Sequence, residues 1–373
     1  MKKLLTICIP TYKRPVTLHR CIASVVEQIQ RFNLQEQVRI YVTNDASPDN
    51  TAQILDEFKS LSFFKHTNRE RNLGMSANIK RMLEEALRES VFQLILTDDD
   101  YLQPEVLESI INFLSEQLAV NPDIPLILTP RYSYTEDGNL HTVVCRPHKQ
   151  DAIFPPSISN AGRYMFNGFV LSGIIVKSSE IDFSLWNEYL ENAYFPVIFS
   201  GDLILRKRSY FWDKNIIHHS VHNECHWERW GNSDAEISLR LYIDFINAYA
   251  AIGKRIGPAY QSLTFYVSAL SSIRNFTNGL IIINGGFFRL SDSESHALMN
   301  IKRVSFSMVE MPAKILFYLA ALKILFDCVV RMGILKLLSI ITPDQYKRKK
   351  RKGSFERHRQ MLANAAFMMR WSH

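Results

Sequence analysis

The first 115 residues alternate between short apolar runs and longer segments with helical spacing. The apolar runs occupy positions 4–9, 38–43 and 92–96, whereas apolar residues recur every three or four positions at 17–30, 50–58, 75–87 and 104–114. Such alternation predicts an α/β fold, a mostly parallel sheet with helices on both faces. Because ligands of these sheets bind at the carboxyl ends of the strands, positions 11–14, 44–47 and 97–100 are expected together at one edge.

The rest of the chain divides by composition. Prolines at 122, 125, 130, 147, 155 and 156 interrupt the next segment, which we interpret as a mixed continuation of the sheet with acceptor-binding loops. From Ser233 to about 340 the pattern is mainly helical. We therefore predict a first domain at 1–230, with halves 1–115 and 116–230, then a helical region at 231–343 and a tail at 344–373.

The net charge of +7 lies in the tail, since residues 344–373 contain nine Lys or Arg against Asp344 and Glu356. The remainder is neutral, which argues against binding of nucleic acid. The apolar stretch at 312–342 carries five charged residues, so a membrane-spanning helix is unfavourable. Two interpretations stay open. Amphipathic helices and the tail contact an anionic membrane through 312–359, or a buried helical hairpin precedes a solvated tail.

The five cysteines are scattered, odd in number and form no CxxC pair, which favours a reducing compartment. The first apolar run is too short for the core of a signal peptide. We therefore expect a cytoplasmic protein at the inner face of the cell membrane.

Three consecutive carboxylates, Asp98, Asp99 and Asp100, follow the apolar run at 92–96 almost directly. Adjacent carboxylates repel one another and lose hydration at the partly buried edge of a sheet. A divalent cation such as Mg²⁺ or Mn²⁺ relieves this repulsion, because it takes carboxylate and phosphate oxygens as ligands. The alternative is an acidic turn that helps to start the helix at Pro104.

A second acidic position, Asp45, ends the strand-like run at 38–43 and can hydrogen-bond the base or ribose of a nucleotide. The first glycine of the chain is Gly74, so the first two strand–helix turns cannot form a glycine-rich phosphate loop. A pyrophosphate at this edge would need a metal and cations instead. Arg69 and Arg71, beside the turn at 72–74, are expected to supply them.

Four segments, ICIPTYKRP, VTNDASPDNT, NRERNLGMSANIKRMLEEA and LILTDDD, occur in this order. Together they resemble the nucleotide-sugar half of family 2 glycosyltransferases, whose fold is called GT-A, over residues 4–115. The resemblance implies a nucleotide site bordered by Pro10, Thr11, Tyr12, Arg14, Asp45, Arg71, Gly74, Asn78, Asp98 and Asp99. It also implies that Asp98 and Asp100 hold the metal through a DxD motif. Asn44 stands where many members carry a second Asp, so the base is open.

Inverting members of the family use a carboxylate to deprotonate the acceptor hydroxyl. The usual Glu-Asp motif is not cleanly present. Glu191 is the preferred candidate on its spacing after 171–174, with Asp202 and Glu188 as alternatives, and each can also be a surface or capping carboxylate.

Histidines cluster at 218–226, with His218, His219, His222 and His226 beside Cys225. One of them is a candidate for an extra metal ligand or an acceptor contact. Trp227 and Trp230 could stack on a sugar or pack in the core.

The interpretation is a metal-dependent, inverting glycosyltransferase in bacterial surface polysaccharide assembly. It would use a nucleotide-sugar as co-substrate and a glycan or lipid-linked glycan as acceptor. The setting comes from the resemblance and the apolar, basic C-terminus. A catalytically inert scaffold of the same fold at the membrane is the alternative. A nucleotidyltransferase is disfavoured because the turn after the first strand lacks glycine.

Overall fold

The computed structural model describes residues 2–135, 138–220 and 234–256. The chain divides into two compact units, Met1–Cys225 and His226–His373, and each is described by itself. The predicted boundary at 230, the segment 312–342 and the basic tail lie outside the described residues, as do His222, Cys225, His226, Trp227 and Trp230. Of the second unit, the structure describes one helix, α8 (Asp234–Ile256).

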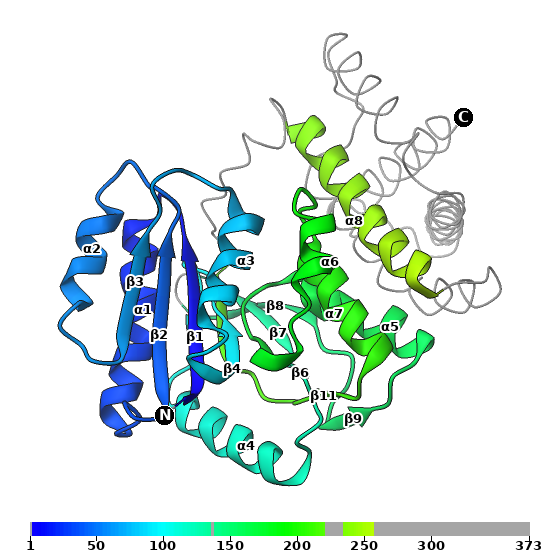
Figure 1. Cartoon of the computed structure of the whole chain (residues 1–373), viewed down its shortest axis with the longest axis horizontal. Helices are drawn as coiled ribbons and strands as arrows, with labels where there is room; N and C mark the ends of the chain where they lie inside the picture. Colours follow the sequence, from blue (N-terminus) through cyan, green and yellow to red (C-terminus); the bar gives the residue numbers. More distant parts are fainter. Residues whose placement is uncertain (1, 136–137, 221–233, 257–373) are drawn as a thin grey trace, which may run out of the picture. The chain divides into compact units, whose positions relative to one another are not determined.

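The first unit opens with the expected alternation of strands and helices (Figure 1). Its elements are β1 (Lys3–Thr11), α1 (Pro15–Arg31), β2 (Val38–Asn44), α2 (Thr51–Phe58), β3 (Phe64–Asn68), α3 (Met75–Ala86) and β4 (Ser90–Ile95). The strands β3, β2, β1 and β4 are neighbours in that order and all parallel. The predicted parallel α/β sheet is therefore confirmed for this half of the unit.

The second half continues the sheet with mixed directions, as the sequence predicts. The elements are β5 (Tyr101–Leu102), α4 (Val106–Val120), β6 (Leu126–Leu128), β7 (Arg131–Tyr134), β8 (Leu140–Cys145), β9 (Ala152–Phe154), α5 (Ile158–Tyr164), η1 (Met165–Phe169), β10 (Ile174–Lys177), η2 (Ser178–Glu180), α6 (Phe183–Glu188), α7 (Phe195–Arg206), β11 (Ser209–Phe211) and β12 (Ile217–Ser220). The main sheet has the order β3-β2-β1-β4-β10-β6-β11-β9, and β10 runs antiparallel to both of its neighbours.

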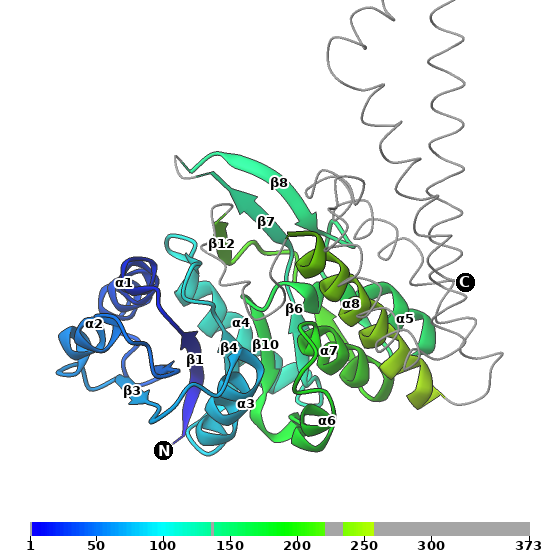
Figure 2. The same ribbon diagram turned by 90° about the horizontal axis from the view of Figure 1, so that it is seen from above.

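A second, four-stranded sheet has the order β5-β12-β7-β8. Figure 2 shows β7, β8 and β12 to one side of the main sheet. The strand β12 runs antiparallel to β5 and parallel to β7. Because β5 begins directly after Asp100, its pairing with β12 brings residues 217–220 next to the acidic cluster.

The core on one face of the parallel sheet follows from the period of two in β1. Leu5, Ile7 and Ile9 are fully buried and belong to one apolar cluster with the inner faces of α1 and α4. The alternate residues of β1 face the side on which α3 packs, with Ile79, Met82 and Leu83 among its buried residues.

The edge strand β3 gives little signal in the sequence. In Phe64–Asn68 only the phenylalanine is buried, and the other four residues are half-buried or exposed. This strand of five residues pairs with β2 alone, so it needs little apolar surface. Among the described residues, no helix is both long and apolar enough to cross a membrane.

A polar network joins β2, β3 and α3 beneath the predicted nucleotide edge. The buried Arg69 donates to both carboxylate oxygens of Glu85, at 2.8 and 2.9 Å, and its Nε donates to Asn78 at 3.2 Å. The Tyr41 hydroxyl donates to the same carboxylate, at 2.5 Å. Burial by itself would raise the pKa of Glu85, but the hydrogen bonds from Arg69 and Tyr41 outweigh it and lower this pKa.

We predict that Glu85→Gln destabilises the protein at neutral pH by about 2 kcal/mol, because it leaves the buried Arg69 without its charge partner. A carboxylate whose native pKa is lowered stabilises the fold above its unfolded pKa and loses this effect as the pH falls through its native pKa. The difference between variant and wild type should therefore shrink below about pH 4. Urea denaturation at several pH values measures it. The control is Glu84→Gln, whose carboxylate pairs with Lys80 one turn away, and an equal loss there would contradict the prediction.

Candidate functional site

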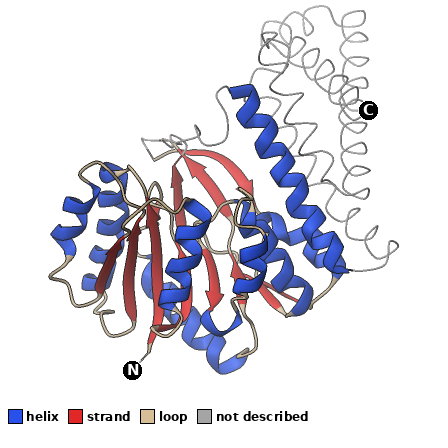
Figure 3. Cartoon of the chain, turned by 45° about the horizontal axis from the view of Figure 1, so that its top comes forward, coloured by secondary structure: helices blue, strands red, loops and turns tan. Residues whose placement is uncertain are grey.

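The carboxyl ends of β1, β2 and β4 meet at one edge of the sheet, as the sequence predicts. Past the strands, backbone hydrogen bonds continue the ladder from Asp45 N to Thr11 O, at 3.0 Å, and from Leu96 N to Cys8 O, at 3.0 Å. In Figure 3 the first strand runs up from the N-terminus to loops at the upper edge. These loops carry most of the predicted site residues.

The turns after β1 and β2 adopt left-handed backbone without glycine. Lys13 has φ 57° and Ala46 has φ 59°. Each such residue costs roughly 1 kcal/mol in isolation. The backbone N–H of Lys13 donates to Ser47 Oγ at 2.9 Å, so the two turns hold each other in place. Asn44 adds to this, since its side chain bonds Asn68 and accepts from Ser47 N.

Asp45 organises the turn before α3. Its two carboxylate oxygens accept hydrogen bonds from the backbone N–H groups of Leu73, at 2.8 Å, and Gly74, at 2.9 Å. Asp45 is buried, and Gly74 has φ 84° and ψ 155°, a conformation that only glycine adopts readily. The first glycine of the chain therefore stands where the backbone requires one.

Arg14 bridges the first two carboxylates of the acidic cluster. Its Nη1 lies 2.9 Å from Asp98 Oδ1 and 2.8 Å from Asp99 Oδ2. Both aspartates are buried, whereas the Arg14 side chain keeps 16% of its surface exposed. A partly exposed cation thus lies between the carboxylates that the sequence assigns to the donor.

Asp100 faces a different partner, the strand β12. His219 Nδ1 lies 3.0 Å from both carboxylate oxygens of Asp100. The backbone N–H of Ser220 donates to Oδ1 at 3.0 Å, and the Thr97 hydroxyl donates to Oδ2 at 3.1 Å. Asp100 is only 1% exposed, so its carboxylate is fixed on three sides.

The three aspartates differ in their pKa values for physical reasons. Burial raises the pKa of Asp98 to about 6, with Arg14 opposing and Asp99 adding to the rise. Burial and the charge of Asp100 raise the pKa of Asp99 as well. Burial would also raise the pKa of Asp100, but the hydrogen bond and charge of His219 outweigh it and lower this pKa. Asp100 is therefore the fully ionised member of the cluster.

The neighbouring His218 has a structural role. Its ring stacks between Tyr101 and Tyr134, with centroid distances of 4.2 Å on both sides, and Arg20 lies over the Tyr101 ring at 4.7 Å. Burial lowers the pKa of His218 and keeps it neutral. This stack fixes the strand on which the next residue, His219, reaches Asp100.

The donor atoms present fit a divalent cation only in part. Asp98 and Asp100 offer buried carboxylate oxygens, and His219 adds a ring nitrogen. Within the described ranges, however, no group of three or more His, Cys, Asp or Glu side chains is arranged to hold an ion. A Mg²⁺ or Mn²⁺ ion commonly takes one or two carboxylates and completes its shell with phosphates and water. The site therefore fits a metal that arrives with a phosphate ligand.

The other predicted donor residues lie at or near the same edge. Pro10 and Thr11 are the buried end of β1, Tyr12 is half-buried in the turn that follows, and Arg71 is exposed beside the Asp45-bound turn. Asn78 is buried, and its amide bonds Arg69 and the Thr43 carbonyl. The sequence predicts that Arg69 neutralises phosphate. In the structure its guanidinium forms an ion pair with Glu85 instead.

The three candidate bases lie in α6, α7 and the loop between them. Glu188 ends α6 and is exposed, and Glu191 is exposed in the loop. Asp202 is buried in α7 and forms an ion pair with Arg206 one turn later. No hydrogen bond or ion pair found among the described residues joins any of the three to Asp98–Asp100, so the identity of the base stays a prediction.

Three contributors to the site were not expected from the sequence. Arg20 donates to Ser220 Oγ at 3.1 Å and to the Asp99 carbonyl at 3.5 Å. Ser172 Oγ accepts from Thr97 N at 2.9 Å and lies 2.7 Å from Thr97 Oγ1. The third is the N–H of Ser220. The only signal for Arg20 is its place six residues after Arg14, and contacts across 75–200 residues leave no local pattern.

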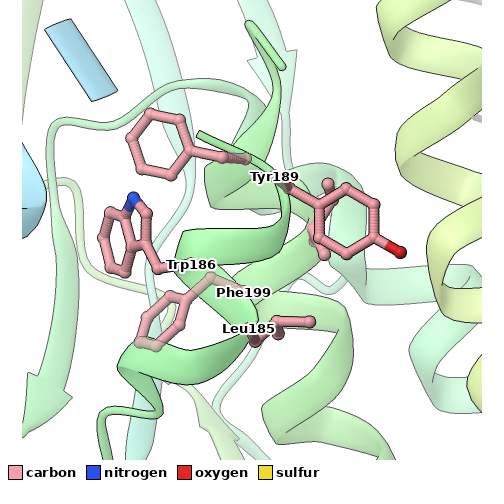
Figure 4. A pocket seen from close by; sticks show the side chains of 6 residues that line it. Leu185, Trp186, Tyr189 and Phe199 are labelled. Atoms are coloured by element: carbon pink, nitrogen blue, oxygen red, sulfur yellow. The ribbon is translucent and has the colours of Figure 1, made fainter. Parts of the chain in front are cut away.

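A small pocket lies between α6 and α7 (Figure 4). Its lining is apolar and mostly aromatic, with Leu185, Trp186, Tyr189, Phe195, Ile198 and Phe199. It shares no residue with the predicted donor site, so we do not assign the nucleotide to it.

Comparison with known protein families identifies the first part of the chain. Residues 6–163 match the family model described as glycosyl transferase family 2. This match agrees with the family resemblance that the four sequence segments carry. The chain is also similar to the glycosyltransferase GlyG of Streptococcus pneumoniae, with 23% identity over 145 residues, which span 39% of this chain and 44% of that relative.

Solved structures are similar to this one in fold. The crystal structure of residues 1–349 of TarS from S. aureus has a TM-score of 0.56 at 15% identity, and the match covers 97% of this chain and 90% of that one. Its complex with UDP-GlcNAc matches with a TM-score of 0.55 at 15% identity, covering 97% and 91%. At this level of identity the likeness shows the fold, which is GT-A as predicted.

We predict that Gly74→Ala weakens nucleotide binding at least tenfold, because a Cβ at this conformation strains the turn and pulls its N–H groups from Asp45. The same strain should lower the stability by about 1–3 kcal/mol. Isothermal titration with nucleoside diphosphates measures the first effect and thermal unfolding the second. Gly138→Ala is the control, since Gly138 also has a positive φ, 80°, in a turn with open space around it. Equal binding by both variants would contradict the assignment of the turn.

Proposed function

We propose that this protein is a glycosyltransferase that uses a nucleotide-sugar donor and a divalent metal. The observation that carries the proposal is that Asp98–Asp100 and the turn held by Asp45 lie at the same carboxyl edge of a GT-A sheet. The family match over residues 6–163 supports the reaction class. The UDP-GlcNAc complex of TarS and the name of the pneumococcal relative point in the same direction.

The donor nucleotide would lie across the ends of β1 and β2. Thr11, Tyr12 and the turn at 72–74 border this edge, and Arg71 is exposed beside it. The chain has no glycine-rich loop here, so cations must balance the diphosphate. Arg14 and Arg20, both at the start of α1 and both touching the acidic cluster, are the nearest ones.

Asp98 and Asp100 would hold the metal, with His219 as a further ligand after a shift of its ring toward the ion. When bound, the metal would offset the charge that develops on the departing nucleoside diphosphate. Asp100 is kept ionised by His219 and oriented by Ser220 N, so its carboxylate is ready for a cation. Arg14 is partly exposed and can leave the two carboxylates for the phosphates.

Transfer with inversion requires one more carboxylate to accept the proton of the acceptor hydroxyl. Glu191 is the preferred base among the three predicted, because its carboxylate is exposed, whereas Asp202 is neutralised by Arg206. None of the three is joined to Asp98–Asp100 by a contact among the described residues. An inert scaffold of the same fold therefore stays as the second candidate function. The acceptor would be a glycan or a lipid-linked glycan, and the membrane contact through 312–359 belongs to the same proposal.

We predict that one of UDP, GDP, CDP or dTDP raises the melting temperature in the presence of Mn²⁺, by a few degrees at 100 times its dissociation constant. Asp100→Asn should abolish the metal-dependent part, because the amide still accepts from Ser220 N but carries no charge. The control Asp123→Asn removes an exposed carboxylate paired with Arg208 and should respond as wild type. The absence of a shift with every nucleotide would exclude the proposed donor site.

We predict that Glu191→Gln lowers the turnover number at least 100-fold while the affinity for the nucleotide stays as in wild type. Release of the nucleoside diphosphate in the presence of acceptor measures turnover, and titration measures affinity. Glu116→Gln, which changes an exposed carboxylate of α4 that is not a candidate base, is the control. Full activity of Glu191→Gln would move the base to Asp202 or Glu188, and inactivity of the wild type with every donor would favour the scaffold.

A further inference from the structure

Arg131 is a fully buried cation that the proposed mechanism does not use. The residue is 1% exposed and begins β7, in the middle of the first unit. Its Nη1 donates to the Thr129 carbonyl at 2.7 Å and also to the Thr129 hydroxyl. Among the described residues, Nε and Nη2 have no hydrogen-bond partner. A buried guanidinium with only one of its three nitrogens hydrogen-bonded costs free energy of folding, which suggests that the charge has a role in function.

The strand register places Arg131 on the side of the acidic cluster. Arg131 and Ser133 share one face of β7, and both are buried, whereas Tyr132 and Tyr134 lie on the other face. Ser133 is the partner of His219 in β12, and His219 in turn contacts Asp100. Arg131 interacts electrostatically with both Asp100 and His219. Burial lowers its pKa to about 10, so the guanidinium stays charged at neutral pH.

The surroundings also prevent Arg131 from moving. Gly173 has φ 86°, and a methyl group at its position would lie 3.0 Å from Arg131 Nη1 and 3.0 Å from Ile217 Cγ1. The absence of a side chain at this residue therefore leaves the space that the guanidinium fills. The Arg14 side chain, in contrast, keeps 16% of its surface exposed. Arg131 is thus enclosed, whereas Arg14 reaches solvent.

We propose that Arg131 is the fixed counter-charge of Asp100 and makes metal binding depend on the diphosphate of the donor. This inference rests on the proposed function. With Arg131 in place, the cluster is close to charge balance and has low affinity for a free divalent ion. A nucleoside diphosphate restores the missing negative charge, so ion and nucleotide bind together. Arg131 is a positioning residue, since its guanidinium is enclosed within the protein.

The sign of the effect on metal affinity tests the inference. Binding of Mn²⁺ to the full chain is measured by electron paramagnetic resonance, first without nucleotide and then with the diphosphate that the thermal-shift screen identifies. Arg131→Gln and Arg131→Met remove the charge, and the amide of Gln can still donate to the Thr129 carbonyl. We expect both to bind Mn²⁺ alone roughly tenfold more tightly than wild type, because one buried repulsion is lost. The gain should shrink when the nucleotide is present.

Two controls separate charge from structure. Arg131→Lys keeps the positive charge and should bind Mn²⁺ as weakly as wild type. Arg208→Gln removes a positive charge on the surface, where it pairs with Asp123, and should also leave Mn²⁺ affinity unchanged. Circular dichroism confirms that each variant is folded.

Weaker or unchanged Mn²⁺ binding in the neutral variants would overturn the inference and leave Arg131 as a purely structural residue. If wild type binds nucleotide, but neither wild type nor any variant binds Mn²⁺ under any condition, the metal and this inference are excluded while the donor site stands. If wild type binds neither, the proposed function itself has failed.

Discussion

Three consecutive carboxylates are buried at the end of β4, and most features of the first unit serve to make this possible. Isolated, such charges would protonate or force the loop into water. Here Arg14, just before α1, forms ion pairs with Asp98 and Asp99. His219 of β12, more than 100 residues later in the chain, contacts Asp100. The small sheet β5-β12-β7-β8 holds that strand next to the acidic cluster. The fold thus supplies the partners that the buried carboxylates need.

The parallel half of the fold was predictable because each of its central strands and helices buries an apolar face. The predicted helix at 17–30 is Pro15–Arg31, and the run at 38–43 is Val38–Asn44. The helix predicted at 104–114 extends to Val120, because Leu118 still packs on the core although the pattern weakens. Edge strand β3 and the strands of two to six residues in the second sheet bury too few side chains to show a period.

The site was predictable where it lies within one strand-end motif and unpredictable where it spans the chain. Asp45 and the acidic cluster are evident from their positions after predicted strands, whereas Gly74 is assigned to the site through the family resemblance. The choice of His219 over His218 for Asp100 depends on the pleat of β12, which no spacing rule for histidines reveals. Arg131 resembles any arginine in the sequence, and only its burial distinguishes it.

The two histidines of β12 point to opposite faces, one into an aromatic stack and the other onto a carboxylate. A slip of one residue in this strand would turn both side chains to the opposite faces. Either Ser220 would then replace His219 at Asp100, or Ile217 would replace His218 between the two tyrosines, although the strand would still pair with β5 and β7. The connector between β11 and β12, residues 212–216, is therefore intolerant of insertions and deletions even though loops of this kind usually accept them. The length of this connector sets the register of β12. Homologous chains whose connector is one residue longer or shorter would need a compensating change within the strand.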